Sequence, residues 1–168
     1  MKNELKLTEL NDEFRKVIDE YLKRKSIEED DMMKMVLKEV MINFIAEDFA
    51  KLQKAIDKDN KFDIKEPVRE IYFETLCANY IYYNRDFDSI VESAIKRTDE
   101  MREYIMGLDK REHIRSIVKL LADIDDSGLN ERNIALIIIT IYMICKQYDI
   151  NFKKCIADIN VEDILWVK

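Results

Sequence analysis

The stretch IALIIITIYMIC, residues 134–145, decides the fold. It is apolar at almost every position, yet it is shorter than the roughly 20 residues that a membrane-spanning helix needs. A helix that is apolar on all sides is normally buried by other helices. The stretch therefore predicts a central helix at about 131–148, covered by the rest of the chain, and it gives no reason to expect a membrane partner.

The composition of the whole chain favours helices. It has two glycines and one proline in 168 residues, fewer than the turns of a sheet protein of this size normally require. Apolar residues recur at spacings of three and four over long stretches, which indicates amphipathic helices. We predict an all-α fold, a single-domain bundle (1–168) of six to seven helices around the buried helix. The predicted helices are, in order, about 8–25, 26–56, 67–84, 89–107, 110–123, 131–148 and 151–159.

The segment 57–66 contains many turn-forming residues and no apolar periodicity, so it is expected to be a loop. Pro67 would then open the third helix, where its missing N–H costs nothing. That third helix, about 67–84, is apolar or aromatic on nearly every side. One domain has room for few helices of this kind, so part of it is expected to face a partner or a second copy of the chain.

The stretch ADIDDSGLNERNI, 122–134, resembles the first half of a calcium-binding loop. Such a loop needs an aliphatic residue at position 8 and a bidentate Glu at position 12, but here Asn130 and Ile134 occupy these positions. A turn between two helices explains the same residues: Gly128 ends one helix and Asn130 caps the next. We predict a turn and no metal site.

Catalytic and cofactor motifs are scarce. His113 is the single histidine and has polar neighbours, so it is predicted to be solvated at the surface. Cys77, Cys145 and Cys155 lie far apart in apolar surroundings, which is typical of free thiols in a reducing compartment. Two isolated glycines exclude the usual phosphate-binding loops. We predict no catalytic residue, no cofactor and a cytoplasmic location.

Residues 134–160 resemble the C-terminal helices of the MazG-like, all-α nucleotide pyrophosphohydrolases, in which an apolar helix, a short turn and a further helix follow each other. The resemblance implies Mg²⁺ held by paired acids, E-x-x-E on one helix and E-x-x-D on the next. In this chain Ile134 stands three places after Glu131, and Glu39 and Glu47 are eight residues apart. A degenerate pyrophosphohydrolase of this kind is the alternative function.

The favoured function is non-catalytic. The net charge is −7 with no basic stripe, so we expect no direct nucleic-acid binding. Small acidic helical proteins of this type include inhibitors, immunity proteins and anti-defence factors, and the abundance of Lys, Ile, Asn and Tyr fits a bacterial or phage gene. We predict a module that binds a partner protein, or a second copy of itself.

The expected interface lies on the second and third helices, which carry more aromatic residues and methionines than one buried stripe requires. Tyrosine and methionine are both suited to interfaces, because their side chains bury area and adapt to different surfaces. The predicted interface residues are Tyr80, Tyr82, Tyr83, Met32 and Met35. The alternative interpretation is a core helix whose tyrosine hydroxyls reach the surface.

Overall fold

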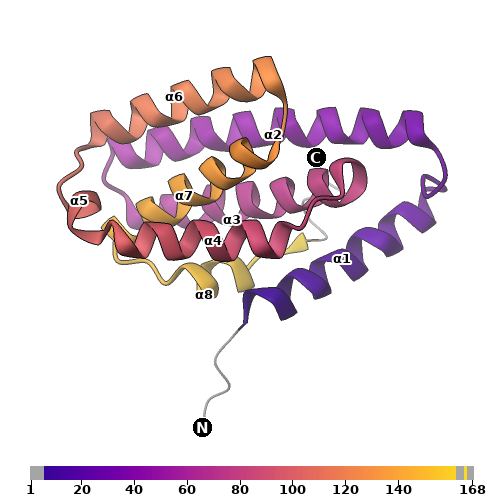
Figure 1. The fold of residues 1–168 in the computed structure, drawn as a ribbon, viewed down its shortest axis with the longest axis horizontal. Coiled ribbons are helices and arrows are strands. Elements are labelled where there is room, and N and C mark those ends of the chain that lie inside the picture. Colours follow the sequence, from indigo (N-terminus) through magenta and orange to yellow (C-terminus); the bar gives the residue numbers. More distant parts are fainter. Residues whose placement is uncertain (1–5, 162–164, 166–168) are drawn as a thin grey trace, which may run out of the picture.

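The computed structural model describes residues 6–161 and residue 165, and all regular structure in these residues is helical (Figure 1). The predicted all-α bundle is confirmed. The elements are α1 (Leu7–Arg24), α2 (Asp31–Asp57), α3 (Lys61–Ala78), a π-helical turn η1 (Asn79–Tyr83), α4 (Phe87–Glu100), α5 (Arg102–Met106), α6 (Lys110–Ser127), α7 (Glu131–Gln147) and α8 (Phe152–Ala157).

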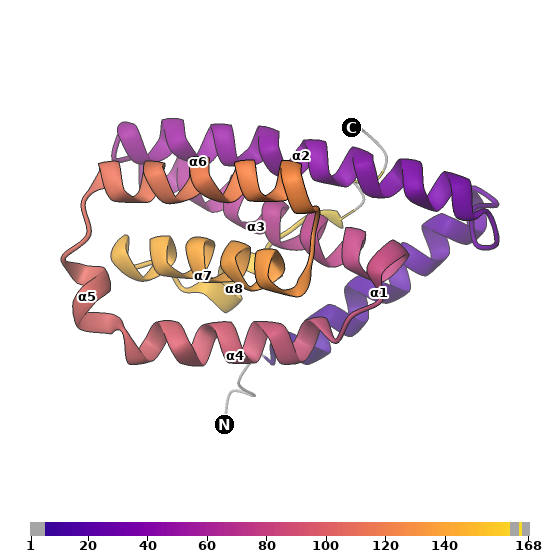
Figure 2. The ribbon, with the colours of Figure 1, turned by 45° about the horizontal axis from the view of Figure 1, so that its top comes forward.

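Helix α7 corresponds to the predicted central helix. It begins at Glu131 because the side chain of Asn130 accepts a hydrogen bond from the backbone N–H of Asn133. It lies between α4 and α6, as Figure 2 shows. Its fully buried isoleucines are Ile134, Ile137, Ile138, Ile141 and Ile144. No helix in the described part of the chain combines the length and the hydropathy that crossing a membrane requires.

Helix α3 is a second buried helix, packed along the length of α2. Every residue from 71 to 79 is buried within the chain itself. The expectation that part of this helix faces a partner is therefore wrong for these residues, because α2, α7 and α8 all pack against α3. The predicted loop is also shorter than expected: Asn60 caps α3 through the N–H groups of Phe62 and Asp63, so Pro67 lies inside the helix.

Polar contacts attach α1 to the bundle. Asn11 is fully buried in α1 and accepts a hydrogen bond from the Tyr72 hydroxyl of α3 at 2.8 Å. The Asn11 amide donates to Asp88 of α4 at 2.7 Å, and Arg15 donates to the same carboxylate at 2.9 Å. These bonds direct α1 toward α3 and α4, and α1 diverges from α2 in Figure 1.

Helix α2 is 27 residues long and opens at Asp31, five residues later than expected. The carboxylate of Asp30 accepts a hydrogen bond from the Met33 N–H and caps this end. The first half of α2 extends beyond the end of α6 in both views (Figures 1 and 2). Several apolar side chains of the sequence MMKMVLKEVM, 32–41, are therefore exposed instead of buried against other helices.

Candidate functional site

Exposed apolar side chains gather on the first two turns of α2. Met32 is 72% exposed, and three neighbours on the same helix are more than 40% exposed. Met35 lies about one turn before Lys38 on α2. The Lys38 ammonium lies 4.5 Å from the centroid of the Tyr82 ring, and Tyr82 is 45% exposed. We call this surface the α2–η1 patch. Its members are Met32, Met33, Met35, Val36 and Tyr82.

The turn η1 places the tyrosines. The N–H of Asn84 donates to the carbonyl of Asn79, an i to i+5 bond, and Asn84 adopts a left-handed conformation with φ 49°. π-Helical turns are rare and often occur at functional sites. The turn rotates the three tyrosines to different sides: Tyr80 toward α1, Tyr83 toward the α6–α7 turn and Tyr82 toward solvent beside α2.

The five predicted interface residues therefore divide into two groups. Tyr82 is exposed, as are Met32 and Met35, and all three belong to the α2–η1 patch. Tyr80 is half-buried and its hydroxyl donates to Asp19 of α1 at 2.9 Å. Tyr83 is half-buried and its hydroxyl accepts a hydrogen bond from the Leu129 N–H at 3.4 Å. Tyr80 and Tyr83 thus connect helices of the chain itself.

The calcium-like stretch forms a turn in the structure. Asp123 and Asp125 lie within α6, where residues two apart point to different sides of the helix. Gly128 ends α6, and Asn133 supports the turn by donating its side-chain amide to the Gly128 carbonyl at 2.7 Å. Asn130 caps α7 as predicted.

We expect Gly128→Ala to lower the free energy of unfolding by about 1–3 kcal/mol. Gly128 has φ 68° and ψ −161°, a region that side-chain-bearing residues rarely adopt. An added Cβ would also lie 3.0 Å from the Tyr83 hydroxyl. Urea unfolding measures the change, and the exposed Gly107, which has an ordinary backbone conformation, provides the matched control Gly107→Ala. Equal stabilities of the two variants would contradict this explanation of the turn.

His113 is buried, so its predicted surface location is wrong. Only 1% of the residue is exposed, and its Nε2 pairs with the side-chain oxygen of Gln147 on α7. The Gln147 amide donates in turn to the Leu108 carbonyl at 2.5 Å. The sequence did contain the signal, because His113 shares a helical stripe with Ile117, Leu120 and Ile124. This contact joins α6 to α7 and involves no nucleophile.

The three cysteines are free thiols and all are buried, as predicted. Burial raises the pKa of each thiol, to about 11 for Cys155 and well above the usual value for Cys145. A nucleophilic cysteine needs the opposite shift, because the thiolate is the reactive form. The cysteines therefore act as small core residues.

One group of side chains in the described part of the chain has the geometry to hold a metal ion. Asp48 of α2 and Glu70 and Glu74 of α3 each offer a carboxylate oxygen, and these oxygens lie within 4.8 Å of one another. Asp48 and Glu74 are fully buried. The Lys51 ammonium lies 2.5 Å from Asp48 and 3.5 Å from Glu70, so a cation of the chain itself already neutralises part of this charge.

The carboxylate cluster was missed by sequence reasoning. Asp48 and Lys51 are three residues apart on α2, and Glu70 and Glu74 are four residues apart on α3. Each pair therefore lies on one face of its helix. What local spacing does not reveal is that these two faces meet when α2 packs on α3. The cluster also lacks the E-x-x-E and E-x-x-D spacing that the pyrophosphohydrolase resemblance implies.

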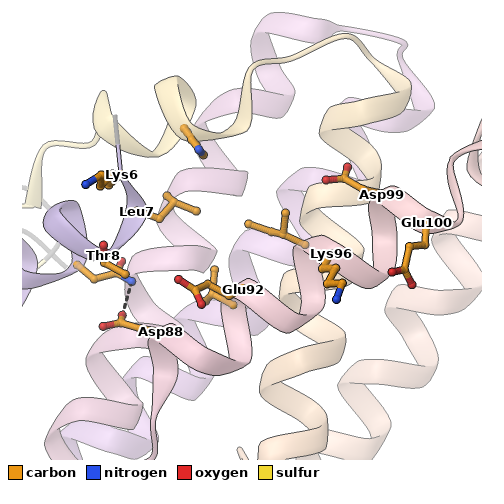
Figure 3. Close-up of a pocket in the computed structure, with 12 residues that line it drawn as sticks. Lys6, Leu7, Thr8, Asp88, Glu92, Lys96, Asp99 and Glu100 are labelled. Atoms are coloured by element: carbon orange, nitrogen blue, oxygen red, sulfur yellow. Dashed lines mark hydrogen bonds between the residues drawn. The ribbon is translucent and has the colours of Figure 1, made fainter. Parts of the chain in front are cut away.

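Two adjoining cavities lie along α4. The first, about 620 Å³, lies between the start of α1 and α4, and Figure 3 shows acids and a lysine of α4 along it. The second, about 720 Å³, lies among α4, α5, α7 and α8 and shares Ile95, Asp99 and Lys153 with the first. Asp99 accepts from the Tyr142 hydroxyl and pairs with Lys146. The carboxylate cluster lines neither cavity.

Two of the acids that line the first cavity, Asp88 and Asp99, are engaged by other side chains of the protein. Asp88 accepts hydrogen bonds from Asn11, drawn as the dashed line in Figure 3, and from Arg15. A floor of Leu7, Val91 and Ile95 gives the cavity apolar character without a nucleophile. No family model, curated protein or solved structure matches this chain.

Proposed function

We propose that this protein is a non-catalytic helical module that binds a partner protein through the α2–η1 patch. The observation that carries the proposal is the cluster of exposed apolar side chains on the projecting half of α2. Contiguous exposed apolar surface on a folded protein often marks an interaction site. Cytoplasmic inhibitors, immunity proteins and anti-defence factors are the functional classes that fit such a module.

The chemistry of the patch supports this proposal. Tyr82 provides an aromatic ring at the surface, and Lys38 lies over that ring while also pairing with Glu39 at 2.6 Å. Aromatic side chains held in place by neighbours often dominate interface energies. Met32 and Met35, on the first turns of α2, add flexible and exposed apolar side chains that can adapt to a partner's shape. The net charge of −7 would accelerate encounter with a basic partner.

One observation favours the alternative function, Mg²⁺-dependent nucleotide hydrolysis: the convergence of Asp48, Glu70 and Glu74. Against it, Lys51 lies among these carboxylates, and the two cavities along α4 are lined by other residues. We therefore expect isothermal titration with Mg²⁺ or Mn²⁺ to show no binding. Binding that is lost in Glu70→Gln would instead favour the hydrolase.

The test of the proposed function is affinity capture with the full chain in its native host, followed by measurement of Kd with the purified partner. The triple variant Met32→Ala/Met35→Ala/Tyr82→Ala should weaken binding by about tenfold or more, because anchor residues contribute about 2 kcal/mol or more each. All three side chains are exposed, so the fold should remain intact.

The matched control removes exposed apolar side chains elsewhere on the protein. Tyr104 and Met106 of α5 are 64% and 58% exposed, so Tyr104→Ala/Met106→Ala removes comparable surface away from the patch. The control should bind the partner as the wild-type protein does. A partner whose Kd is unchanged by the triple variant, or is equally weakened by the control, would overturn the proposed function.

A further inference from the structure

The two adjoining cavities along α4 are large enough to hold one small molecule. They measure about 620 and 720 Å³, and they share Ile95, Asp99 and Lys153 in their walls. Ligand pockets in proteins usually have volumes of about 300–1,000 Å³. We call the two together the α4 cavity. No member of the α2–η1 patch lines it, so it is separate from the proposed protein interface.

The first part of the α4 cavity has an apolar floor. Leu7 of α1 and Val91 of α4 are buried, and Ile95 of α4 is half-buried. In Figure 3 the Leu7 side chain extends from α1 toward α4. A hydrocarbon chain placed on this floor would leave water for contact with these side chains, which is a main source of affinity for apolar ligands.

The second part of the α4 cavity adds uncharged hydrogen-bond donors to apolar walls such as Phe152. The Gln147 amide donates one N–H to the Leu108 carbonyl, and the Asn151 side-chain oxygen accepts from the Lys154 N–H. A side-chain amide has two N–H donors, so both amides keep at least one for a ligand. An oxygen-bearing head group would meet these donors.

The charged side chains that line the α4 cavity balance one another. The acidic side chains are Asp88, Glu92, Asp99, Glu100 and Asp149. The basic side chains are Lys6, Lys96, Arg102, Lys146 and Lys153. Five basic groups and five acidic groups leave no net charge on the walls.

Ion pairs that reach outside the α4 cavity keep this balance. Within the walls, Asp99 pairs with Lys146 at 3.1 Å. Arg15 pairs with Asp88 at 2.9 Å, and Glu9 lies 3.9 Å from Lys6, so these neighbours add one charge of each sign. A ligand with a charged head would therefore leave water without an excess of opposite charge to receive it, which costs free energy.

We propose that the α4 cavity binds an uncharged amphiphile, a hydrocarbon chain with a hydroxyl or ester head. The chain packs on Leu7, Val91 and Ile95. The head accepts hydrogen bonds from the amides of Gln147 and Asn151. This site goes beyond the proposed function and does not depend on it, because the α2–η1 patch lies on other residues.

The test compares three ligands that have the same hydrocarbon chain length and different heads: monolaurin, which is uncharged, laurate, which is anionic, and dodecylamine, which is cationic. Isothermal titration with the full-length protein, below the concentrations at which these ligands form micelles, measures each Kd. Monolaurin should bind at least about tenfold more tightly than the other two. No binding of monolaurin, or binding of laurate or dodecylamine that is equally tight, would overturn the inference.

Variants that fill the α4 cavity locate the binding site. Ile95→Trp fills the part that the two cavities share, and Thr8→Trp narrows the first part from the α1 side. Each should weaken monolaurin binding at least about tenfold. The matched control is Ile139→Trp on α7, a half-buried isoleucine that lines a separate cavity of about 230 Å³, and it should bind as the wild-type protein does.

Circular dichroism identifies which of these variants are folded. An unchanged Kd for monolaurin in a folded Ile95→Trp or Thr8→Trp protein would overturn the inference. An equal loss of binding in Ile139→Trp would do the same, because that side chain lies outside the α4 cavity.

Two double variants test the charge balance directly. Glu92→Gln/Glu100→Gln leaves the basic groups in excess and should shift the preference toward laurate. Lys6→Gln/Lys96→Gln leaves the acids in excess and should shift it toward dodecylamine. All four side chains are exposed, so the fold should be retained. Ligand preferences that are the same in both double variants as in the wild-type protein would contradict the assignment of an uncharged ligand.

Discussion

Ile137→Asp should prevent stable folding. Ile137 is fully buried in α7, between α4 and α6. The substitution would place a carboxylate in this buried apolar core, and burying an unpaired charge costs several kcal/mol. A protein of this size has a total stability of ~5–15 kcal/mol, so most or all of it would be lost. Circular dichroism with thermal unfolding should show a strongly lowered Tm or no cooperative transition.

The control for Ile137→Asp is Val118→Asp on α6. Val118 is 57% exposed, so the same acidic side chain would remain in water. This variant should change the free energy of unfolding by about 0.5 kcal/mol or less. If Ile137→Asp unfolds at the same temperature as Val118→Asp, α7 is not the buried centre of the bundle.

Lys51→Met should lower the free energy of unfolding by about 3 kcal/mol. The substitution removes the ammonium 2.5 Å from the buried carboxylate of Asp48 while keeping a side chain of similar length. This loss is at the lower end of the range expected when a buried ion pair is broken. The Lys51 side chain is half exposed, so water already screens part of its interaction with Asp48. Urea unfolding at neutral pH measures the change.

Two further variants test the electrostatic cause. Lys54→Met removes an exposed lysine one turn later on α2 and should leave the stability within about 0.5 kcal/mol of wild type. Asp48→Asn combined with Lys51→Met should recover part of the lost stability, because the buried carboxylate nearest the lost ammonium is then neutral. A Lys51→Met protein as stable as Lys54→Met would show that the ammonium does not stabilise the cluster.

The fold was predictable where the sequence signal was local and strong. The apolar run at 134–145 and the cap Asn130 are local features, and the structure confirms this cap. The start of α3 was missed because turn-forming residues at 57–66 suggested a loop, whereas the turn is confined to the residues before Lys61. The interior position of Pro67 followed from that error.

The candidate sites depended on contacts that no local pattern encodes. The π-helical turn η1 has no recognised sequence signature, yet it decides that Tyr82 faces solvent while Tyr80 and Tyr83 contact other helices. Exposure of Met32 and Met35 follows from the length of α2 relative to α6, which is set by packing. The burial of His113 was, in contrast, readable from its apolar stripe on α6.

The most direct test of partner binding through the α2–η1 patch is the Kd of the captured partner for Tyr82→Ala, measured alongside Tm for all three tyrosine variants. We predict that Tyr82→Ala weakens binding and keeps the wild-type Tm. Tyr80→Ala and Tyr83→Ala should lower Tm, because their hydroxyls bond to Asp19 and Leu129. A Tyr82→Ala protein that loses stability as they do, with unchanged partner affinity, would contradict the account.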